Sequence, residues 1–122
     1  MPEVGKVMLL LKNMVYESTS PLETLRFAKY YRKKGLGVIV ILWGPMGVVL
    51  AKAGKHRGAP VYDAKIVECI ELGVEFKCCQ LAADIIGLEE DELIPGIEMI
   101  KSHVVAELFL EYQSEGELII SL

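Results

Sequence analysis

The residue with the clearest chemical potential in this sequence is Cys79, which follows a short apolar segment and precedes an amphipathic one. Residues 74–78 have the alternation of a strand, and the segment after Cys79 has the pattern of a helix as far as Gly87. Ligands and chemistry collect at the carboxyl ends of strands in open α/β sheets. The unpaired N–H groups at a helix start also stabilise thiolate over thiol. We therefore expect Cys79 to be a reactive, partly exposed cysteine at a strand-to-helix junction.

The other two cysteines, Cys69 and Cys78, have a weaker case for reactivity. In an alternating strand Cys78 shares a face with Phe76, and this is the face expected to be covered, which favours a structural role. Cys69 falls on the apolar face of an expected helix, where a free cysteine is most often a small buried side chain. The same structural role is the alternative for Cys79. A disulfide between Cys78 and Cys79 would be strained, and the expected compartment is reducing.

These residues predict neither a metal nor a cofactor. A metal site would have to combine the two adjacent cysteines with His56 and His103, but adjacent cysteines rarely bind one ion and no CxxC or HxxxH spacing exists. The segment YESTSP, residues 16–21, lacks the Thr/Ser-Gly spacing of a flavin phosphate loop. The segment GPMG, residues 44–47, lacks the GxGxxG spacing of a dinucleotide site and fits a tight turn instead.

Three consecutive basic residues are candidates for supporting a reactive thiolate. They are Lys55, His56 and Arg57. They follow a turn and a short expected helix after the second apolar strand, so they could lie near the same carboxyl edge as Cys79. The alternative is a polar surface loop.

The rest of the chain alternates short apolar runs with longer amphipathic segments, the pattern of a mostly parallel sheet with helices on both faces. The expected strands are residues 7–11, 38–43, 74–78 and 118–120, with 97–100 as a weaker fifth. Besides the helix after Cys79, the expected helices are residues 20–35, 46–53, 62–72 and a last one from 104 that ends at Gly116.

The helix over residues 20–35 has two features of its own. Ser20, Pro21 and Glu23 have the spacing of a capping box, with serine as the N-cap and proline at the first helical position. The side opposite its apolar face carries a basic stripe. The stripe consists of Arg26, Lys29 and Lys33. Such a stripe fits either an acidic partner or a solvated helix face.

Length and composition limit the class of protein. The chain has 122 residues, 52% of them hydrophobic, and a mean hydropathy of +0.38. We therefore expect one domain, residues 1–122, with apolar surface left for another subunit. The longest uncharged run, residues 36–51, is interrupted by Gly and Pro, so no membrane span is expected. With no signal peptide evident we expect a cytoplasmic protein, and the net charge of −4 argues against nucleic-acid binding.

The segment from residue 73 to 97 resembles the DsrE/DsrF-like family of small sulfur-trafficking proteins. The residues that carry the resemblance are Gly73, Val74, Cys79, Gln80, Asp84, Gly87, Leu93, Ile94 and Gly96. The glycine-containing turn within residues 38–55 and the helix, glycine and strand within 103–121 also resemble the family. The chain differs from many relatives at Cys78, where they have a small or apolar residue, and it lacks the Arg-Gly that follows the cysteine in some branches.

The resemblance implies a three-layer, flavodoxin-like or Rossmann-like fold with a roughly five-stranded, mainly parallel sheet. It also implies homo-oligomers, often trimers or hexamers, and a persulfide on Cys79 that passes from sulfur donor to sulfur acceptor proteins. Gln80 and Asp84 are family-like neighbours of Cys79. The first hypothesis is thus a cytoplasmic sulfur-relay protein, whether or not it turns over as an enzyme. The second is a non-catalytic binding or regulatory module that holds a nucleotide-like ligand at the carboxyl edge of the sheet.

Overall fold

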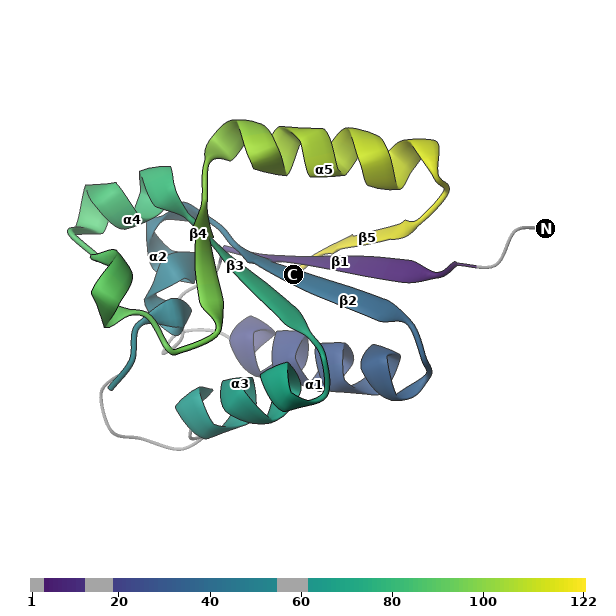
Figure 1. The fold of residues 1–122 in the computed structure, drawn as a ribbon, viewed down its shortest axis with the longest axis horizontal. Helices are drawn as coiled ribbons and strands as arrows, with labels where there is room; N and C mark the ends of the chain where they lie inside the picture. The colour runs from purple at the N-terminus through teal and green to yellow at the C-terminus, as the bar shows by residue number, and fades with distance from the viewer. Residues whose placement is uncertain (1–3, 13–18, 55–61) are drawn as a thin grey trace.

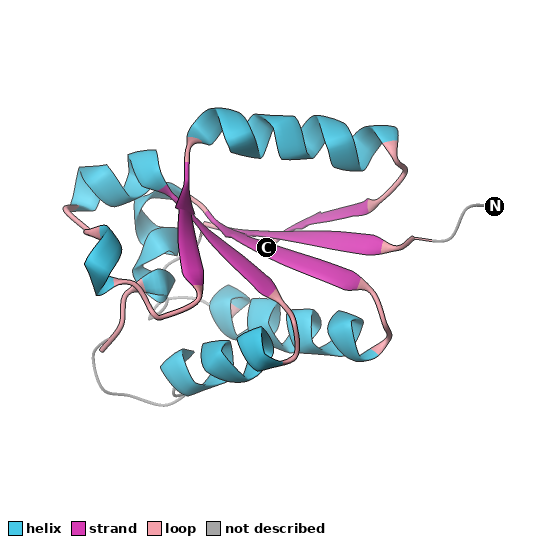
Figure 2. Cartoon of the chain, in the orientation of Figure 1, coloured by secondary structure: helices cyan, strands magenta, loops and turns pink. Residues whose placement is uncertain are grey.

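The computed structural model describes residues 4–12, 19–54 and 62–122 of the chain. Within these residues five strands form one parallel sheet in the order β4-β3-β2-β1-β5 (Figure 1). The strands are β1 Lys6–Leu11, β2 Gly37–Leu42, β3 Glu75–Cys79, β4 Ile97–Ile100 and β5 Leu118–Ser121. The helices are α1 Ser20–Lys33, α2 Gly44–Gly47, α3 Tyr62–Glu71, α4 Gln80–Ile86 and α5 Ser102–Ser114, with 3₁₀ turns η1 Val48–Ala51 and η2 Glu90–Glu92 (Figure 2).

The helices form one layer on each face of the sheet. α1 and α3 lie side by side on one face, and α5 covers the other (Figure 1). α2 and α4 pack against each other at the carboxyl edge, where β2 and β3 end. This arrangement confirms the three-layer α/β fold expected from the sequence and sharpens it, because all five strands described are parallel.

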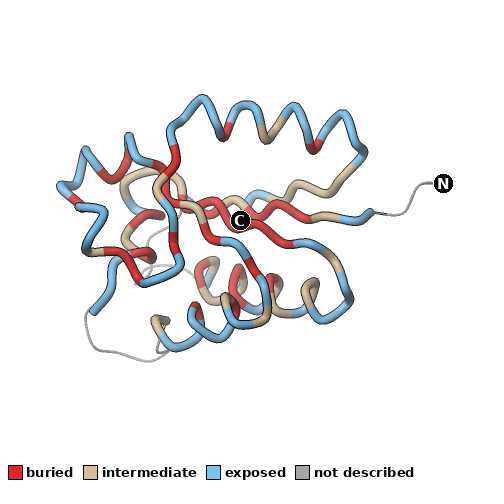
Figure 3. The backbone as a smooth tube through the Cα atoms, in the orientation of Figure 1, coloured by how far each residue is buried: buried red, intermediate tan, exposed pale blue. Residues whose placement is uncertain are grey.

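The burial of the strands explains their composition. β2 lies between β1 and β3 and has helices over both faces, so after Gly37 every residue of the strand is buried (Figure 3). β4 lies at one edge of the sheet and mixes buried and exposed residues. Its Glu98 is paired with Lys77 of β3, with 3.3 Å between the ammonium and carboxylate. The weaker prediction of a strand over residues 97–100 is therefore confirmed, and its edge position accounts for its weaker sequence pattern.

The start of α1 differs from the predicted capping box. Thr19 is the N-cap and makes no side-chain capping bond, while Ser20 is already helical. The Glu23 carboxylate lies 3.7 Å from the Arg26 guanidinium, and the Glu23 amide donates to the Thr19 carbonyl at 2.9 Å. The prediction of Ser20 as N-cap was wrong by one residue, because the helix begins one position earlier than the Ser-Pro-Leu-Glu pattern indicates.

The carboxyl edge of the sheet is held by a very close contact between α2 and the end of β1. A Cβ added at Gly47 would lie 2.4 Å from the Leu11 carbonyl oxygen and 2.9 Å from the Lys12 Cα. Only glycine lets the two backbones approach so closely. Gly47 therefore fixes the position of α2, against which α4 packs.

None of the helices in the described ranges is long and apolar enough to span a membrane.

Candidate functional site

Cys79 lies where β3 ends and α4 begins. It is the last residue of β3, pairs with Ile100 of β4, and serves as the N-cap of α4 with the extended dihedrals φ −66° and ψ 117°. α4 ends at Gly87, which adopts the left-handed conformation with φ 74°. The strand-to-helix junction predicted from the sequence is therefore present.

The thiol of Cys79 is less accessible than the sequence suggested. Cys79 is only 4% exposed and belongs to the main apolar core together with Ala82 and Ala83 of α4. The expectation of partial exposure was wrong for the chain by itself, because the apolar core encloses the end of β3 as far as Cys79. Reagents and partner thiols therefore reach this sulfur only if the packing around the end of β3 opens.

Cys78, the neighbour of Cys79 on β3, is also part of the core. It is fully buried, as is Phe76 at 1% exposure, and both belong to the same main core as Cys79. Burial, followed by the neighbouring Cys79, raises the pKa of the Cys78 thiol to about 12. Cys78 is thus held as a neutral thiol, in a position suited to packing rather than to nucleophilic attack.

Cys69 is also buried in the interior of the protein. It is 2% exposed on α3, and its thiol donates a weak hydrogen bond to the Leu25 carbonyl oxygen of α1 at 3.7 Å. Burial raises the pKa of this thiol as well. Of the three cysteines, Cys79 alone lies at the carboxyl edge of the sheet.

Gln80 and Asp84 lie on the exposed side of α4, one helical turn apart. Together with Leu81 they line a shallow groove of about 310 Å³, whose other wall is Lys101 and Ser102 at the start of α5. The sequence analysis did not single out Lys101 and Ser102. They follow β4 directly, so a firmer prediction of that strand would have placed them at the same carboxyl edge.

The exposed side of α4 also carries large apolar side chains. Leu81 is 60% exposed and Ile85 is 66% exposed, and the two lie one turn apart on the helix. The two side chains form an exposed apolar strip on the helix that begins at the candidate thiol.

Two of the predicted supporting residues, His56 and Arg57, lie outside the described residues, as does Lys55. Residues 16–18 of the segment weighed as a flavin loop, residues 16–21, also lie outside them. In the described ranges no group of three or more His, Cys, Asp and Glu side chains could hold a metal ion.

Comparisons with known proteins support the fold and identify a family. The sequence model of the DsrE/DsrF-like family matches residues 5–120. The uncharacterized protein MK0008 of Methanopyrus kandleri is 30% identical over 101 residues, which cover 82% of this chain and 83% of that protein. The crystal structure of the ychN protein from E. coli matches with a TM-score of 0.85 at 20% identity. The match covers 98% of this chain and 100% of the ychN chain. The structure of MTH1491, a protein of unknown function from Methanobacterium thermoautotrophicum, matches with a TM-score of 0.71 at 20% identity. The match covers 96% of this chain and 98% of the MTH1491 chain.

Proposed function

This chain belongs to the DsrE/DsrF-like family, and from that membership we propose that it is a sulfur-relay protein that carries sulfur as a persulfide on Cys79. The observation that carries the proposal is the position of Cys79 at the carboxyl end of β3, within the match to the family. The other two cysteines support it by contrast, because neither lies at a junction of strand and helix: Cys69 is inside α3 and Cys78 is inside β3.

The proposed chemistry is two successive sulfur transfers. The Cys79 thiolate attacks the outer sulfur of a donor persulfide, the donor S–S bond breaks, and the donor leaves as a thiolate. The sulfur is then held on Cys79 as a persulfide until an acceptor thiolate attacks it and Cys79 leaves as a thiolate. Each transfer exchanges one S–S bond for another, so no external oxidant or reductant is needed.

Access to the thiol is the physical requirement that this chemistry adds. α4 has seven residues, and its buried side chains are those of Ala82 and Ala83, which share the core with Cys79. A short helix with few large buried side chains is held by little apolar contact, so its local displacement is less costly than that of α1 or α5. In the proposal a docked partner displaces α4 and uncovers the sulfur, and Gln80 and Asp84 are the first polar groups that the partner meets.

The partners proposed are sulfur donor and acceptor proteins, together with further copies of this chain in a cytoplasmic homo-oligomer. The exposed Leu81 and Ile85 of α4 supply an apolar surface beside Cys79 for such contacts. The proposal includes no cofactor, metal or nucleic acid.

Intact mass spectrometry after incubation with a sulfane donor tests the proposal. We expect wild type to gain the mass of one sulfur atom, and we expect Cys69→Ser to do the same. Cys79→Ser should gain none, and a small acceptor thiol should remove the sulfur from wild type. An equal gain on Cys79→Ser, or none on wild type, would contradict the proposal.

The alternative function, a module that holds a nucleotide-like ligand at the carboxyl edge, has a different signature. It would be favoured by a ligand-induced rise in melting temperature that survives Cys79→Ala, in a protein that takes up no sulfur. The groove beside α4, about 310 Å³, is where such a ligand would have to lie in the described part of the edge.

A further inference from the structure

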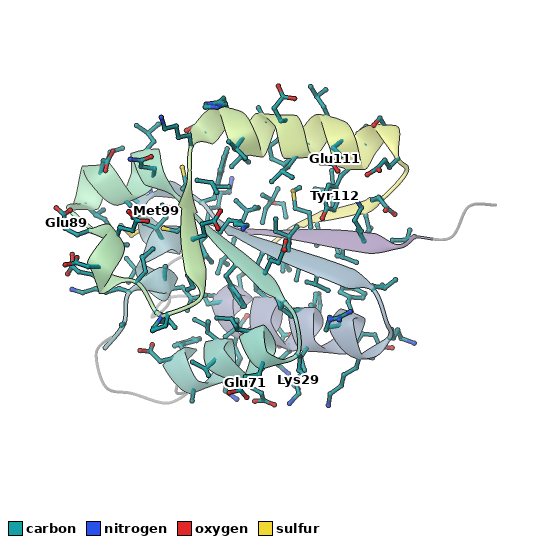
Figure 4. The ribbon with its side chains drawn as sticks, viewed as in Figure 1. Lys29, Glu71, Glu89, Met99, Glu111 and Tyr112 are labelled. Atoms are coloured by element: carbon teal, nitrogen blue, oxygen red, sulfur yellow. The ribbon has the colours of Figure 1, made fainter. Side chains whose placement is uncertain are left out.

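A second groove lies far from Cys79, between α1 and α3 on the face of the molecule that points away from the sheet. We call it the α1/α3 groove, and its volume is about 540 Å³. Its lining residues are Leu22, Leu25, Arg26, Lys29, Tyr30, Lys33, Lys65, Glu68 and Cys69. Figure 4 shows one of them, Lys29, on the outer side of these helices. The groove thus has an apolar floor and a rim of charged side chains.

The charge of the α1/α3 groove is opposite to that of the rest of the chain. Four cations and one carboxylate line it, which gives a charge of +3. The whole chain carries −4, so the residues outside the groove carry −7. An acidic partner would therefore be repelled by most of the molecule and attracted to this groove.

The carboxylate of the groove, Glu68, is surrounded by cations from both helices. The Lys29 ammonium is hydrogen-bonded to the Glu68 carboxylate across the two helices. This bond and the charge of Lys29, followed by the charges of Lys65 and Lys33, lower the pKa of Glu68. Glu68 thus marks a point where positive charge from both helices converges.

Two of these cations do not take part in ion pairs in the part of the chain described here. Lys33 and Lys65 are exposed and form no ion pair with any carboxylate in that part. Arg32, on the same helix, differs from them. Its guanidinium donates to the carbonyl oxygens of Leu72 at 2.8 Å and Leu36 at 3.3 Å, and so ties α1 to the end of α3. The rim lysines remain available to a ligand.

An exposed aromatic ring lies at the border of the groove. Tyr30 is 58% exposed and also lines a neighbouring depression of about 440 Å³, whose lining includes Arg26, Phe27 and Tyr31. Tyr30 and Arg26 thus form a ridge between two hollows. Tyrosine and arginine are the residue types that most often dominate protein–protein binding energy.

From these observations we propose that the α1/α3 groove docks an acidic, partly apolar segment of a partner protein. The glutamates or aspartates of the segment pair with Lys33, Lys65 and Arg26, and its apolar side chains contact the leucine floor and Tyr30. The proposal goes beyond sulfur transfer, because docking here does not depend on a sulfur atom on Cys79.

The shape of the site favours a protein segment over a small anion. The cations are spread along α1 at positions 26, 29 and 33, and the separation of seven positions between the first and the last corresponds to about 10 Å of helix. The charged groups that line the groove are flexible side chains on the sides of two helices, rather than backbone N–H groups converging on one phosphate. A ligand that uses all of them has to be extended and to carry several separate charges.

Fluorescence anisotropy with a short, fluorescein-labelled peptide rich in Glu and Leu tests the proposal. We expect Lys33→Gln/Lys65→Gln to weaken binding about tenfold, since two charge contacts are lost. The matched control, Lys12→Gln/Lys52→Gln, removes two exposed lysines elsewhere and should bind like wild type. Tyr30→Ala should also weaken binding, whereas Leu110→Ala, which removes an apolar side chain 67% exposed on α5, should not.

Four outcomes would overturn the proposal. The first three are equal affinity for a peptide with Lys in place of Glu, equal loss in both double variants, and tighter binding of inorganic pyrophosphate than of the Glu/Leu peptide. Absence of peptide binding to wild type would overturn it as well. Cys79→Ser should bind the peptide like wild type, so failure of the sulfur-relay proposal and failure of this one are distinguishable.

Discussion

The carboxyl edge around Cys79 and the α1/α3 groove are two regions with opposite physical character. At the edge the backbones of α2 and β1 are in contact through Gly47, and the thiol is 4% exposed. In the groove, Lys33 and Lys65 are exposed and form no ion pair among the described residues. The comparison separates two tasks in the proposed account. The edge encloses the candidate thiol within tight packing, and the two groove lysines present charge without taking part in an ion pair.

The largest expected effect comes from filling the close contact at the edge. Gly47→Ala should lower the free energy of unfolding by about 3 kcal/mol, because the new Cβ meets the Leu11 carbonyl oxygen at 2.4 Å. Gly47 has φ −70°, which alanine adopts readily, so the loss comes from the contact and not from the backbone conformation. Urea denaturation measures it.

The control is Gly5→Ala, where the nearest atom to the new Cβ is the Glu117 carboxylate oxygen at 3.7 Å. This variant should unfold like wild type. If Gly47→Ala were as stable as Gly5→Ala, the edge would not be held by the contact described here.

The next effect concerns the buried thiol beside the candidate site. Cys78→Ser should destabilise the fold by about 2 kcal/mol, because it places a hydroxyl in a fully buried apolar position. Cys78→Ala should be better tolerated, since it buries no polar atom. Chemical denaturation of the two variants side by side checks the prediction, and equal stabilities would show that the position is hydrated.

A smaller effect should appear at pH 10. The pKa of Cys78 is raised from 9.0 to about 12, so above pH 9 the folded state keeps the proton that the unfolded state loses. Stability from the neutral thiol is fully present below pH 9 and is lost as pH rises toward 12, and by pH 10 the loss is about 1.4 kcal/mol. Unfolding of Cys78→Ala should depend less steeply on pH in this window. If stability fell with pH as steeply in Cys78→Ala as in wild type, the raised pKa of Cys78 would not be the cause.

The smallest expected effect is in the α1/α3 groove. Lys33→Gln/Lys65→Gln should leave the melting temperature unchanged within error, because both side chains are exposed and form no ion pair in the described structure. Differential scanning fluorimetry suffices. A clear drop would mean that the groove lysines stabilise the fold, and the contrast between the two regions would be lost.

The sequence predicted the fold well because most of its signals are local. The continuous apolar runs of β1 and β2 predict these two strands from their own residues. In the same way, Gly87 predicts the end of the helix that follows Cys79. The start of α1 was placed one residue late because the same Ser-Pro-Leu-Glu pattern is compatible with two adjacent N-caps.

The site was predicted in position but not in environment. The alternation of residues 74–78 correctly placed Cys78 on the covered face with Phe76. The burial of Cys79 depends on which elements pack around the end of β3. The α1/α3 groove exists only because α3, which carries Lys65, packs beside α1. Both are tertiary relations between distant segments, which periodicity along one element does not contain.

The most direct test of the central claim is site-resolved mapping of sulfur in wild type, where all three cysteines compete. After brief incubation with a sulfane donor, peptide fragmentation distinguishes a persulfide on Cys79 from one on the adjacent Cys78. We predict sulfur on Cys79, with Cys78 and Cys69 unmodified in the folded protein because both thiols are buried and neutral. Sulfur on Cys78 or Cys69 in preference to Cys79 would contradict the account.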